Sequence, residues 1–514
     1  MLKNKFKNPL RRIVSSVLAA TSLLTMLATG IGGITASAAS ADYNYYKSDY
    51  ANHSAWQNAS VLKNQEICEE GFTLLKNDDG FLPLKPAEGQ SKIKTSVFGK
   101  HSARYISLGY GSSVVTSLTS SLYEVLSSSI FDLNPTLTNF YNDDSLSGSW
   151  FNGNQSIDNF ITGLPVRETP ITSYTDTIKA SYKDYNELAI VVIARPASEG
   201  SDLAQVSLKN GSGARDDSNK LDGARHWDDH ALQLNANEVD MLQMVMDNFD
   251  DIVIILDCAS YIELGFLNDP THYLYTDNGY TSSVEEATEK MNKIKSLVNI
   301  SYAGTHGNKA LPRILTGEVN PSGHLADTWI KDMKADPVFQ NFGLAGMSSM
   351  NYGNNYIHYD EDIYMGYRYY ETRYVEEDAE TRDQWYFDSV MYPFGYGLSY
   401  TEFTHEIIGT IPEMGAELPK DGKISVGIRV TNVGDVAGKD AVGVYYNAPY
   451  YRGGIAKAHV NLADFAKTSL IQPGEYEDIF IEFDVSDMYS YDWSDANNNG
   501  FKGYELDPVL TSLS

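Results

Sequence analysis

Seven apolar residues, Leu188 to Ala194, run directly into a loop that carries two carboxylates. A short continuous run rich in Ile and Val is typical of a strand that is buried on both faces of a parallel sheet. Pro196 and Gly200 end this strand and favour a loop. Open α/β sheets bind ligands beyond the carboxyl ends of their strands, so Glu199 in this loop is a candidate proton donor. A solvated acidic loop is the alternative interpretation.

Apolar strand candidates alternate with helix-compatible segments along the first two thirds of the chain. Strands are expected at 95–99, 188–194, 252–256 and 297–303, and helices at 55–75, 237–248 and 283–297. This alternation predicts βαβ units around a mostly parallel sheet. We therefore expect a layered α/β sandwich over residues 55–330, followed by an extended connecting segment over 331–400 that shows little clear periodicity.

The pattern becomes all-β beyond residue 401. Residues 424–430, 441–446 and 476–485 read as strands, and turns are expected at Val433-Gly434-Asp435 and Pro473-Gly474-Glu475. Short strands with such turns predict a β-sandwich over residues 401–514. Asp495 to Gly500 is similar to the start of a calcium loop, but the twelfth position is Leu506, which has no carboxylate, so we expect a polar turn.

Residues 1–38 have the organisation of a secretory signal peptide. Basic residues precede an apolar run from Ile13 to Ile34, and Ala36-Ser37-Ala38 has the small side chains of a cleavage site. An uncleaved membrane anchor is the alternative. We expect a secreted or cell-surface protein.

The net charge and the cysteine content limit the kinds of binding partner and of source organism that we expect. The net charge of −29, from 68 acidic and 39 basic residues, argues against nucleic acid and anionic membranes. Cys68 and Cys258 fall in a predicted helix and strand, so buried thiols are favoured over a disulfide. An exported chain this poor in cysteine is typical of bacteria.

The ten histidines show no metal-ligand spacing, and we expect His226 and His230 to face solvent in a long loop.

Several segments, in one shared order, resemble family 3 glycoside hydrolases. Residues 69–77 and 82–84 resemble the entry to the second domain of that family, and Asn320-Pro321-Ser322-Gly323-His324-Leu325 resembles its exit turn. Residues 362–370 and 392–400, which include Phe394-Gly395-Tyr396-Gly397, resemble the segment that leads into a fibronectin type III-like domain. Residues 431–438 and 464–467 resemble that domain itself. We expect both glycine-containing turns to be structural. In the first, Pro321 fixes φ and Gly323 is free to take a positive φ; in the second, aromatic side chains pack beside backbone that must approach another segment closely.

The resemblance implies a retaining, β-glucosidase-like enzyme that acts on a β-linked oligosaccharide or glycoside and needs no cofactor or metal. Such an enzyme needs a nucleophile and an acid/base about 5 Å apart. Glu199 falls at the family's acid/base position, Asp202 at that of a sugar contact or a partner of Glu199, and Ser112 lies in a loop that borders the sugar.

The family's nucleophile is an Asp of a (β/α)8 barrel, and too few residues separate the signal from the α/β region to form one. Asp492-Trp493 is similar to the nucleophile's Asp-Trp pair, but it lies in the β-sandwich and is rejected. We therefore expect the permuted domain order, with a barrel last and the sequence ending before it. Residues 509–514 depart from the family's final strand, so we expect a truncated β-domain, with a frameshift as the hypothesis.

A non-catalytic carbohydrate-binding or scaffold protein is the second hypothesis. A flavodoxin-like cofactor binder is disfavoured because no Gly-rich phosphate fingerprint follows the first strand.

Overall fold

The computed structural model describes residues 49–106, 120–148, 167–195, 205–208, 214–258, 260–341, 359–412, 418, 422–448, 450, 453–506 and 512–513. The predicted signal at 1–38 lies outside these residues. The chain divides into Met1–Gln57 and a larger unit, Asn58–Ser514, and the contacts below lie within the larger unit. Within the described ranges, no helix combines the length and the apolar character needed to cross a bilayer.

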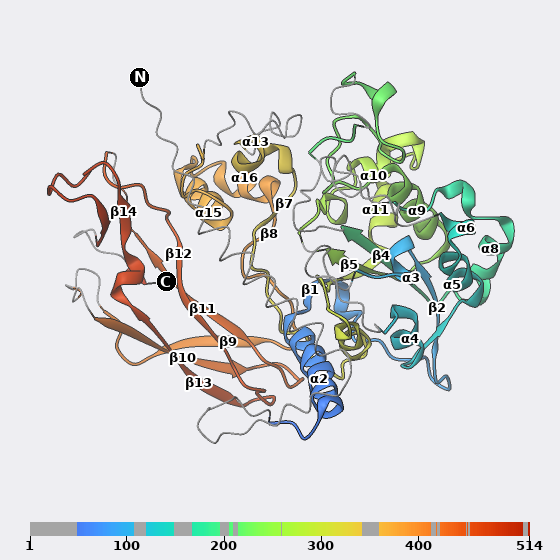
Figure 1. Cartoon of the computed structure of the whole chain (residues 1–514), viewed down its shortest axis with the longest axis horizontal. Coiled ribbons are helices and arrows are strands. Elements are labelled where there is room, and N and C mark those ends of the chain that lie inside the picture. The colour runs from blue at the N-terminus through green and yellow to red at the C-terminus, as the bar shows by residue number, and fades with distance from the viewer. Residues whose placement is uncertain are drawn as a thin grey trace, which may run out of the picture. The chain divides into compact units, whose positions relative to one another are not determined.

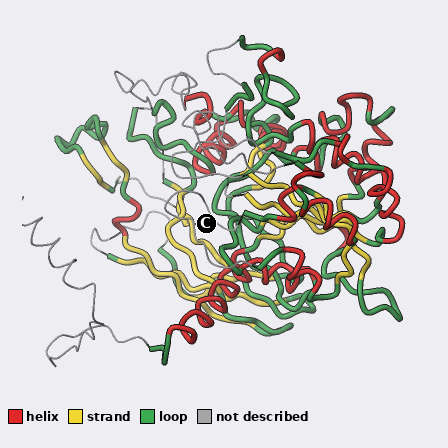
Figure 2. The backbone as a smooth tube through the Cα atoms, turned by 45° about the vertical axis from the view of Figure 1, so that its right-hand side comes forward, coloured by secondary structure: helices red, strands yellow, loops and turns green. Residues whose placement is uncertain are grey.

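A six-stranded mixed sheet forms the centre of the α/β region, with helices on both of its faces (Figures 1 and 2). Its order is β1-β6-β5-β4-β2-β3, and only β1 runs antiparallel to its neighbour. The strands are β1 Thr73–Asn77, β2 Ile93–Phe98, β3 Phe131–Leu133, β4 Leu188–Arg195, β5 Ile252–Cys258 and β6 Ile294–Asn299. The predicted α/β class with a mostly parallel sheet is confirmed.

The side chains of β4 alternate between two hydrophobic cores, because successive residues of a strand point to opposite faces. Val191 and Ile193 belong to one core, and Ile190 and Val192 to the other. Helices that contribute to the first core are α5 Pro135–Asn142, α8 Asp176–Ser181, α9 Ala236–Asn248, α10 Tyr273–Thr276 and α11 Val284–Met291. Helices that contribute to the second are α2 His53–Gly71, α4 Leu122–Ser127 and α12 Ala310–Leu315. Burial on both faces explains why residues 188–194 of β4 are continuously apolar.

Two predicted helices are too long. The helix expected at 55–75 ends at Gly71, and Thr73 to Asn77 instead pair with β6 as β1. The helix expected at 283–297 ends at Met291, and β6 occupies 294–299 rather than the predicted 297–303. In both places, pairing across the sheet determines the conformation of residues whose local pattern was compatible with a helix.

The connecting segment contains helices that its sequence did not reveal. It forms α13 Pro337–Asn341, α15 Tyr367–Glu376 and α16 Arg382–Ser389, and a small sheet pairs β7 Trp329–Ile330 with β8 Val390–Tyr392. The expectation of an extended excursion is therefore wrong for these residues. The short remaining helices of the α/β region are α3 Lys100–Ala103 and α6 Asp144–Ser147.

Two three-stranded sheets share one core after residue 401, as expected of a β-sandwich. Their orders are β13-β10-β9 and β12-β11-β16. The strands are β9 Phe403–Ile408, β10 Lys423–Asn432, β11 Ala441–Asn447, β12 Asn461–Lys467, β13 Tyr476–Asp484 and β16 Ser512–Leu513, with a separate hairpin of β14 Ser490–Asp492 and β15 Gly503–Glu505. The fibronectin type III-like character remains a prediction.

The two glycine-containing turns meet at the junction between these regions. A Cβ atom on Gly397 would lie 2.1 Å from the carbonyl oxygen of Gly323, and one on Gly323 would lie 2.5 Å from that of Gly71. Two backbone hydrogen bonds of 2.8 Å hold the turns together. Leu325 N donates to Tyr396 O, and Gly395 N donates to Leu325 O. The close approach of backbone predicted for residues 394–397 is confirmed at Gly397, whereas Gly323 does not take the positive φ that its turn allowed.

The Asn320 side chain joins three segments at this junction. Its Oδ1 accepts hydrogen bonds from Ser399 Oγ at 2.9 Å and from Tyr400 N at 2.8 Å. Its Nδ2 donates to the carbonyl oxygen of Ala437 at 3.1 Å. One amide therefore connects the end of the α/β region to both the entry and a turn of the β-sandwich.

We expect Gly397→Ala to destabilise the protein, because the added methyl group would overlap a backbone carbonyl that cannot move alone. Overpacking of this kind costs about 1–3 kcal/mol. Thermal unfolding followed by circular dichroism measures the effect. Gly71→Ala is the control, because a Cβ atom there meets nothing within 4 Å. Equal melting temperatures for the two variants would contradict the proposed contact.

Candidate active site

The carboxyl edge of the sheet holds the ends of both loops in which sequence analysis placed site residues. Glu199 and Asp202 belong to residues 196–204, and Ser112 to residues 107–119; all three lie outside the described residues. The first of these segments follows β4 directly. The second begins after Ile106, which contacts the end of β5. The described residues therefore bring the starts of the two loops to the same edge.

Arg195, the last residue of β4, is fully buried and fixes the start of the loop that carries Glu199. Its two Nη atoms donate to the two carboxylate oxygens of Glu238 at 2.7 and 3.0 Å. Its guanidinium also donates to the carbonyl oxygens of Ala231, Gln233 and Ala194. Burial disfavours the charged guanidinium, but the adjacent Glu238 carboxylate raises the pKa of Arg195 above its ordinary value. This side chain is a structural anchor, because its donors are engaged within the protein.

Glu238 has a second role as the N3 residue of the capping box of α9, whose N-cap residue is Asn235. Its Oε2 accepts the backbone N–H of Asn235 at 2.9 Å, while the Asn235 side chain accepts the N–H of Glu238 at 3.0 Å. This is a capping box. Sequence analysis missed Glu238, although the Asn-x-x-Glu spacing before an apolar helix is a recognisable signal.

The carbonyl oxygen of Arg195 is also held, by a hydrogen bond of 3.0 Å from the hydroxyl of Tyr302 beyond β6. Beyond the loop, the backbone N–H of Ser207 donates to Trp227 O at 2.9 Å, and its hydroxyl donates to Asp229 O at 2.8 Å. Both sides of the segment that carries Glu199 are therefore anchored to the sheet edge or to the segment that follows.

Asp257, near the end of β5, anchors the loop that carries Ser112. Its Oδ2 accepts the backbone N–H of Ile106 at 2.5 Å, and its Oδ1 has no hydrogen-bond partner among the described atoms. Burial raises the pKa of this carboxyl well above its ordinary value. On the other side of the loop, Ser120 Oγ donates to Asn308 Oδ1 at 2.8 Å and Asn308 Nδ2 donates back to Ser120 O.

Further buried ionisable groups lie after β2. The Lys100 ammonium donates to Asp144 Oδ1 at 2.9 Å and to Ser147 Oγ at 2.6 Å. The Glu168 carboxyl accepts the backbone N–H groups of Lys100 and Thr169, yet burial raises its pKa to about 8. Burial lowers the pKa of His101 to about 4. At neutral pH the carboxyl of Glu168 is thus mainly protonated and the imidazole of His101 neutral.

One histidine differs from the sequence-based expectation. His226 faces solvent, but His230 is buried, with Nε2 3.0 Å from Glu263 Oε1 and its ring beside Phe339. The prediction of a solvent-facing His230 is therefore wrong, because Glu263 and Phe339, which are distant in sequence, cover the ring.

Other sequence-based expectations are confirmed. Cys68 and Cys258 are buried and unpaired. Asp495 Oδ1 accepts the backbone N–H groups of Asn499 and Gly500, as expected of a polar turn. Asp492 accepts backbone N–H groups of the same turn, which gives it a structural role.

We expect Arg195→Met to lower the free energy of unfolding by about 3–5 kcal/mol, because Glu238 would remain buried without its partner. The double variant Arg195→Met/Glu238→Gln removes both charges and is expected to recover part of the loss. Urea unfolding followed by intrinsic fluorescence measures both. Lys423→Ala, which breaks an exposed ion pair with Glu482, is the control and should have little effect. An equal loss in the single and double variants would contradict this account.

We expect the contribution of Asp257 to the stability of the protein to become less favourable as the pH rises above about 4. Its native carboxyl keeps a proton that the unfolded chain releases, so the native state binds more protons in this range and loses stability with rising pH. Asp257→Asn should therefore show a smaller fall in melting temperature between pH 5 and pH 8 than the unsubstituted protein. Asp250→Asn, at a side chain that is 91% exposed, is the control. Identical pH dependence in all three proteins would contradict the burial of an ionisable Asp257.

Comparison with known proteins places this architecture in a family. The model of the glycosyl hydrolase family 3 C-terminal domain matches residues 72–400. β-Glucosidase A of Butyrivibrio fibrisolvens is 30% identical over 440 residues, which are 83% of this chain and 46% of that protein. A β-glucosidase of Ruminococcus albus is 29% identical over 459 residues, which are 87% of this chain and 38% of that protein. The chain thus spans less than half of the length of these relatives.

Solved structures show the same fold. A β-glucosidase from Paenibacillus barengoltzii superimposes with a TM-score of 0.64 at 27% identity, over 85% of this chain and 39% of that one. β-Glucosidase 3B from Thermotoga neapolitana, solved with α-D-glucose, superimposes with a TM-score of 0.60 at 23% identity, over 85% of this chain and 50% of that one. The match across most of the α/β region and the connecting segment shows that the chain belongs to glycosyl hydrolase family 3, of which it contains the C-terminal domain.

Proposed function

We propose that this chain is the α/β and β-sandwich part of an exported enzyme that hydrolyses β-glucosides, and that Glu199 is its general acid/base. The observation that carries the proposal is the anchored end of β4. Arg195 and Tyr302 fix the start of the loop that contains Glu199 at the carboxyl edge of a parallel sheet. The names of the relatives from Butyrivibrio and Ruminococcus support the choice of β-glucosides as substrates.

In this proposal, Glu199 first donates a proton to the glycosidic oxygen as the aglycone departs. It then removes a proton from the water that hydrolyses the glycosyl-enzyme intermediate. The nucleophile would be the Asp of a (β/α)8 barrel, as the family resemblance implies. Asp202 would contact the sugar or Glu199, and Ser112 would border the bound sugar. The buried groups of the sheet edge have a positioning role, because they hold the two loops.

The rigid edge contributes to catalysis by orientation. A general acid is effective only within hydrogen-bond reach of the atom that it protonates. The covalent continuity between the fixed Arg195 and Glu199 limits the positions that the carboxyl can reach. Loss of the Arg195 anchor should therefore affect the acid/base even though Arg195 contacts no substrate.

We expect the purified 514-residue chain to show no turnover of 4-nitrophenyl β-glucoside, because the nucleophile would come from the barrel. In a protein that also contains the barrel, Glu199→Gln should lower kcat/KM for cellobiose by about 10²–10⁴-fold, the usual contribution of a general acid/base. The loss should be smaller for 4-nitrophenyl β-glucoside, whose leaving group needs less protonation. Steady-state kinetics on both substrates makes the comparison.

Glu285→Gln, at an exposed position of α11, is the matched control and should leave the kinetics unchanged. Turnover by the 514-residue chain that depends on Glu199 would overturn the assignment of the nucleophile to a barrel. An unchanged kcat/KM in Glu199→Gln would overturn the assignment of the acid/base.

A further inference from the structure

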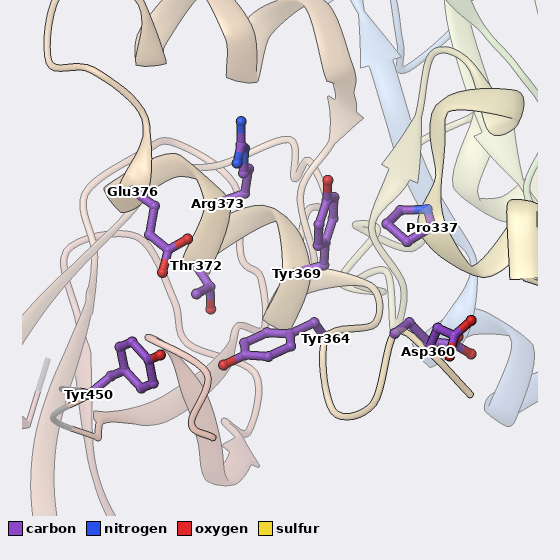
Figure 3. A pocket seen from close by; sticks show the side chains of 9 residues that line it. Pro337, Asp360, Tyr364, Tyr369, Thr372, Arg373, Glu376 and Tyr450 are labelled. Carbon is purple, nitrogen blue, oxygen red and sulfur yellow. The ribbon is translucent and has the colours of Figure 1, made fainter. Parts of the chain in front are cut away.

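A cavity of about 430 Å³ lies where the connecting segment meets the loops of the β-sandwich (Figure 3). Its volume is within the range of about 300–1,000 Å³ that is usual for small-molecule sites. The described residues that line it belong to 337–376 and to Tyr450 of the β-sandwich. The aromatic residues Tyr364, Tyr369 and Tyr450 line it together with charged side chains of both signs.

One face of α15 provides a wall of the cavity. Tyr369, Thr372, Arg373 and Glu376 are spaced at i, i+3, i+4 and i+7, so they lie on the same side of the helix. Figure 3 shows Thr372 and Glu376 above the rings of Tyr364 and Tyr450, and the ring of Tyr369 beside Pro337. The regular spacing means that a single rigid element positions an aromatic ring, a cation and a carboxylate.

Hydrogen bonds fix this wall against the β-sandwich. The hydroxyl of Tyr364 donates to the carbonyl oxygen of Lys457 at 3.2 Å. The hydroxyl of Thr372 accepts the backbone N–H of His459 at 2.8 Å. The backbone N–H of Leu462 donates to the hydroxyl of Tyr367 at 3.1 Å. A ligand would therefore enter a site that is already formed, which lowers the entropic cost of binding.

The charges of the lining select the class of ligand. Asp360, Glu361 and Glu376 disfavour an anion, and the charge of Arg373 is compensated by an ion pair with Glu377. A neutral ligand with many hydroxyl groups avoids this penalty, because its hydroxyls can donate to the carboxylates and accept from the guanidinium. Tyrosine rings add apolar faces for the C–H groups of such a ligand. We propose that this cavity binds a neutral pyranose unit of an oligosaccharide, at a site distinct from the Glu199 edge.

This proposal concerns binding alone and does not depend on turnover. Isothermal titration calorimetry of the full 514-residue chain with cellobiose and cellotriose tests it, with tetramethylammonium chloride and inorganic phosphate as charged probes. We expect binding of the two sugars and none of the charged probes. Stronger binding of either charged probe than of cellobiose would overturn the assignment of a neutral ligand.

Two substitutions locate the site. Tyr450→Ala removes a ring that is 53% exposed, and we expect it to weaken sugar binding about tenfold, which is near the upper end for one aromatic contact. Glu376→Gln should weaken binding by a smaller factor. Tyr450→Phe keeps the ring and should retain most of the affinity, which separates loss of the contact from loss of the fold.

The matched controls are Tyr504→Ala, at a tyrosine that is 69% exposed on β15, and Glu285→Gln on α11. Neither should change the dissociation constant. Unchanged affinity in Tyr450→Ala and Glu376→Gln, or an equal loss in the controls, would overturn the proposed site. If Glu199→Gln alone abolished sugar binding, the sugar would occupy the proposed catalytic edge, and the function would stand while this inference failed.

Discussion

The buried ion pair between Arg195 and Glu238 is the interaction on which the geometry of the sheet edge depends. A guanidinium in the protein interior is tolerated only when opposite charge and hydrogen-bond acceptors surround it. Here a carboxylate and three backbone carbonyls meet that requirement, and they come from β4, α9 and the segment before α9. These elements cannot shift independently without exposing a buried charge to unfavourable surroundings. Such a pair adds little net stability, but it specifies one arrangement of the edge.

The other buried ionisable groups lower the charge of the same edge. Asp257 and Glu168 have raised pKa values and His101 has a lowered one, in each case mainly because of burial. Neutral forms of these groups avoid the large cost of an isolated charge in the interior. Arg195 and Lys100 keep partners of opposite charge. The edge therefore combines a few compensated charges with several neutral hydrogen-bonding groups. These groups hold the two loops without placing a strong net charge next to them.

The strands β4 and β5 and the helix α9 could be predicted from the sequence, because their local residue patterns favour the same structure as their tertiary environment. β4 and β5 are apolar because both faces are buried, and α9 begins at a capping box. The predictions failed where the two conflict. Residues after Gly71 have a helix-compatible pattern, yet the edge of the sheet offers them a strand partner. His230 reads as a loop residue, and only distant residues bury it. A contact such as that between Arg195 and Glu238 depends on which elements become neighbours in the fold. A local residue pattern does not predict this.

The junction at Asn320 has a consequence for how proteins of this kind can be rearranged. Asn320 precedes the connecting segment, and its amide contacts residues at the end of that segment and in the β-sandwich. The glycines nearby allow backbone to meet backbone. A recombination event within 320–437 would separate Asn320 from at least one of these partners. The α/β region and the β-sandwich are thus expected to be inherited as one block, whatever position that block takes in a gene relative to other domains.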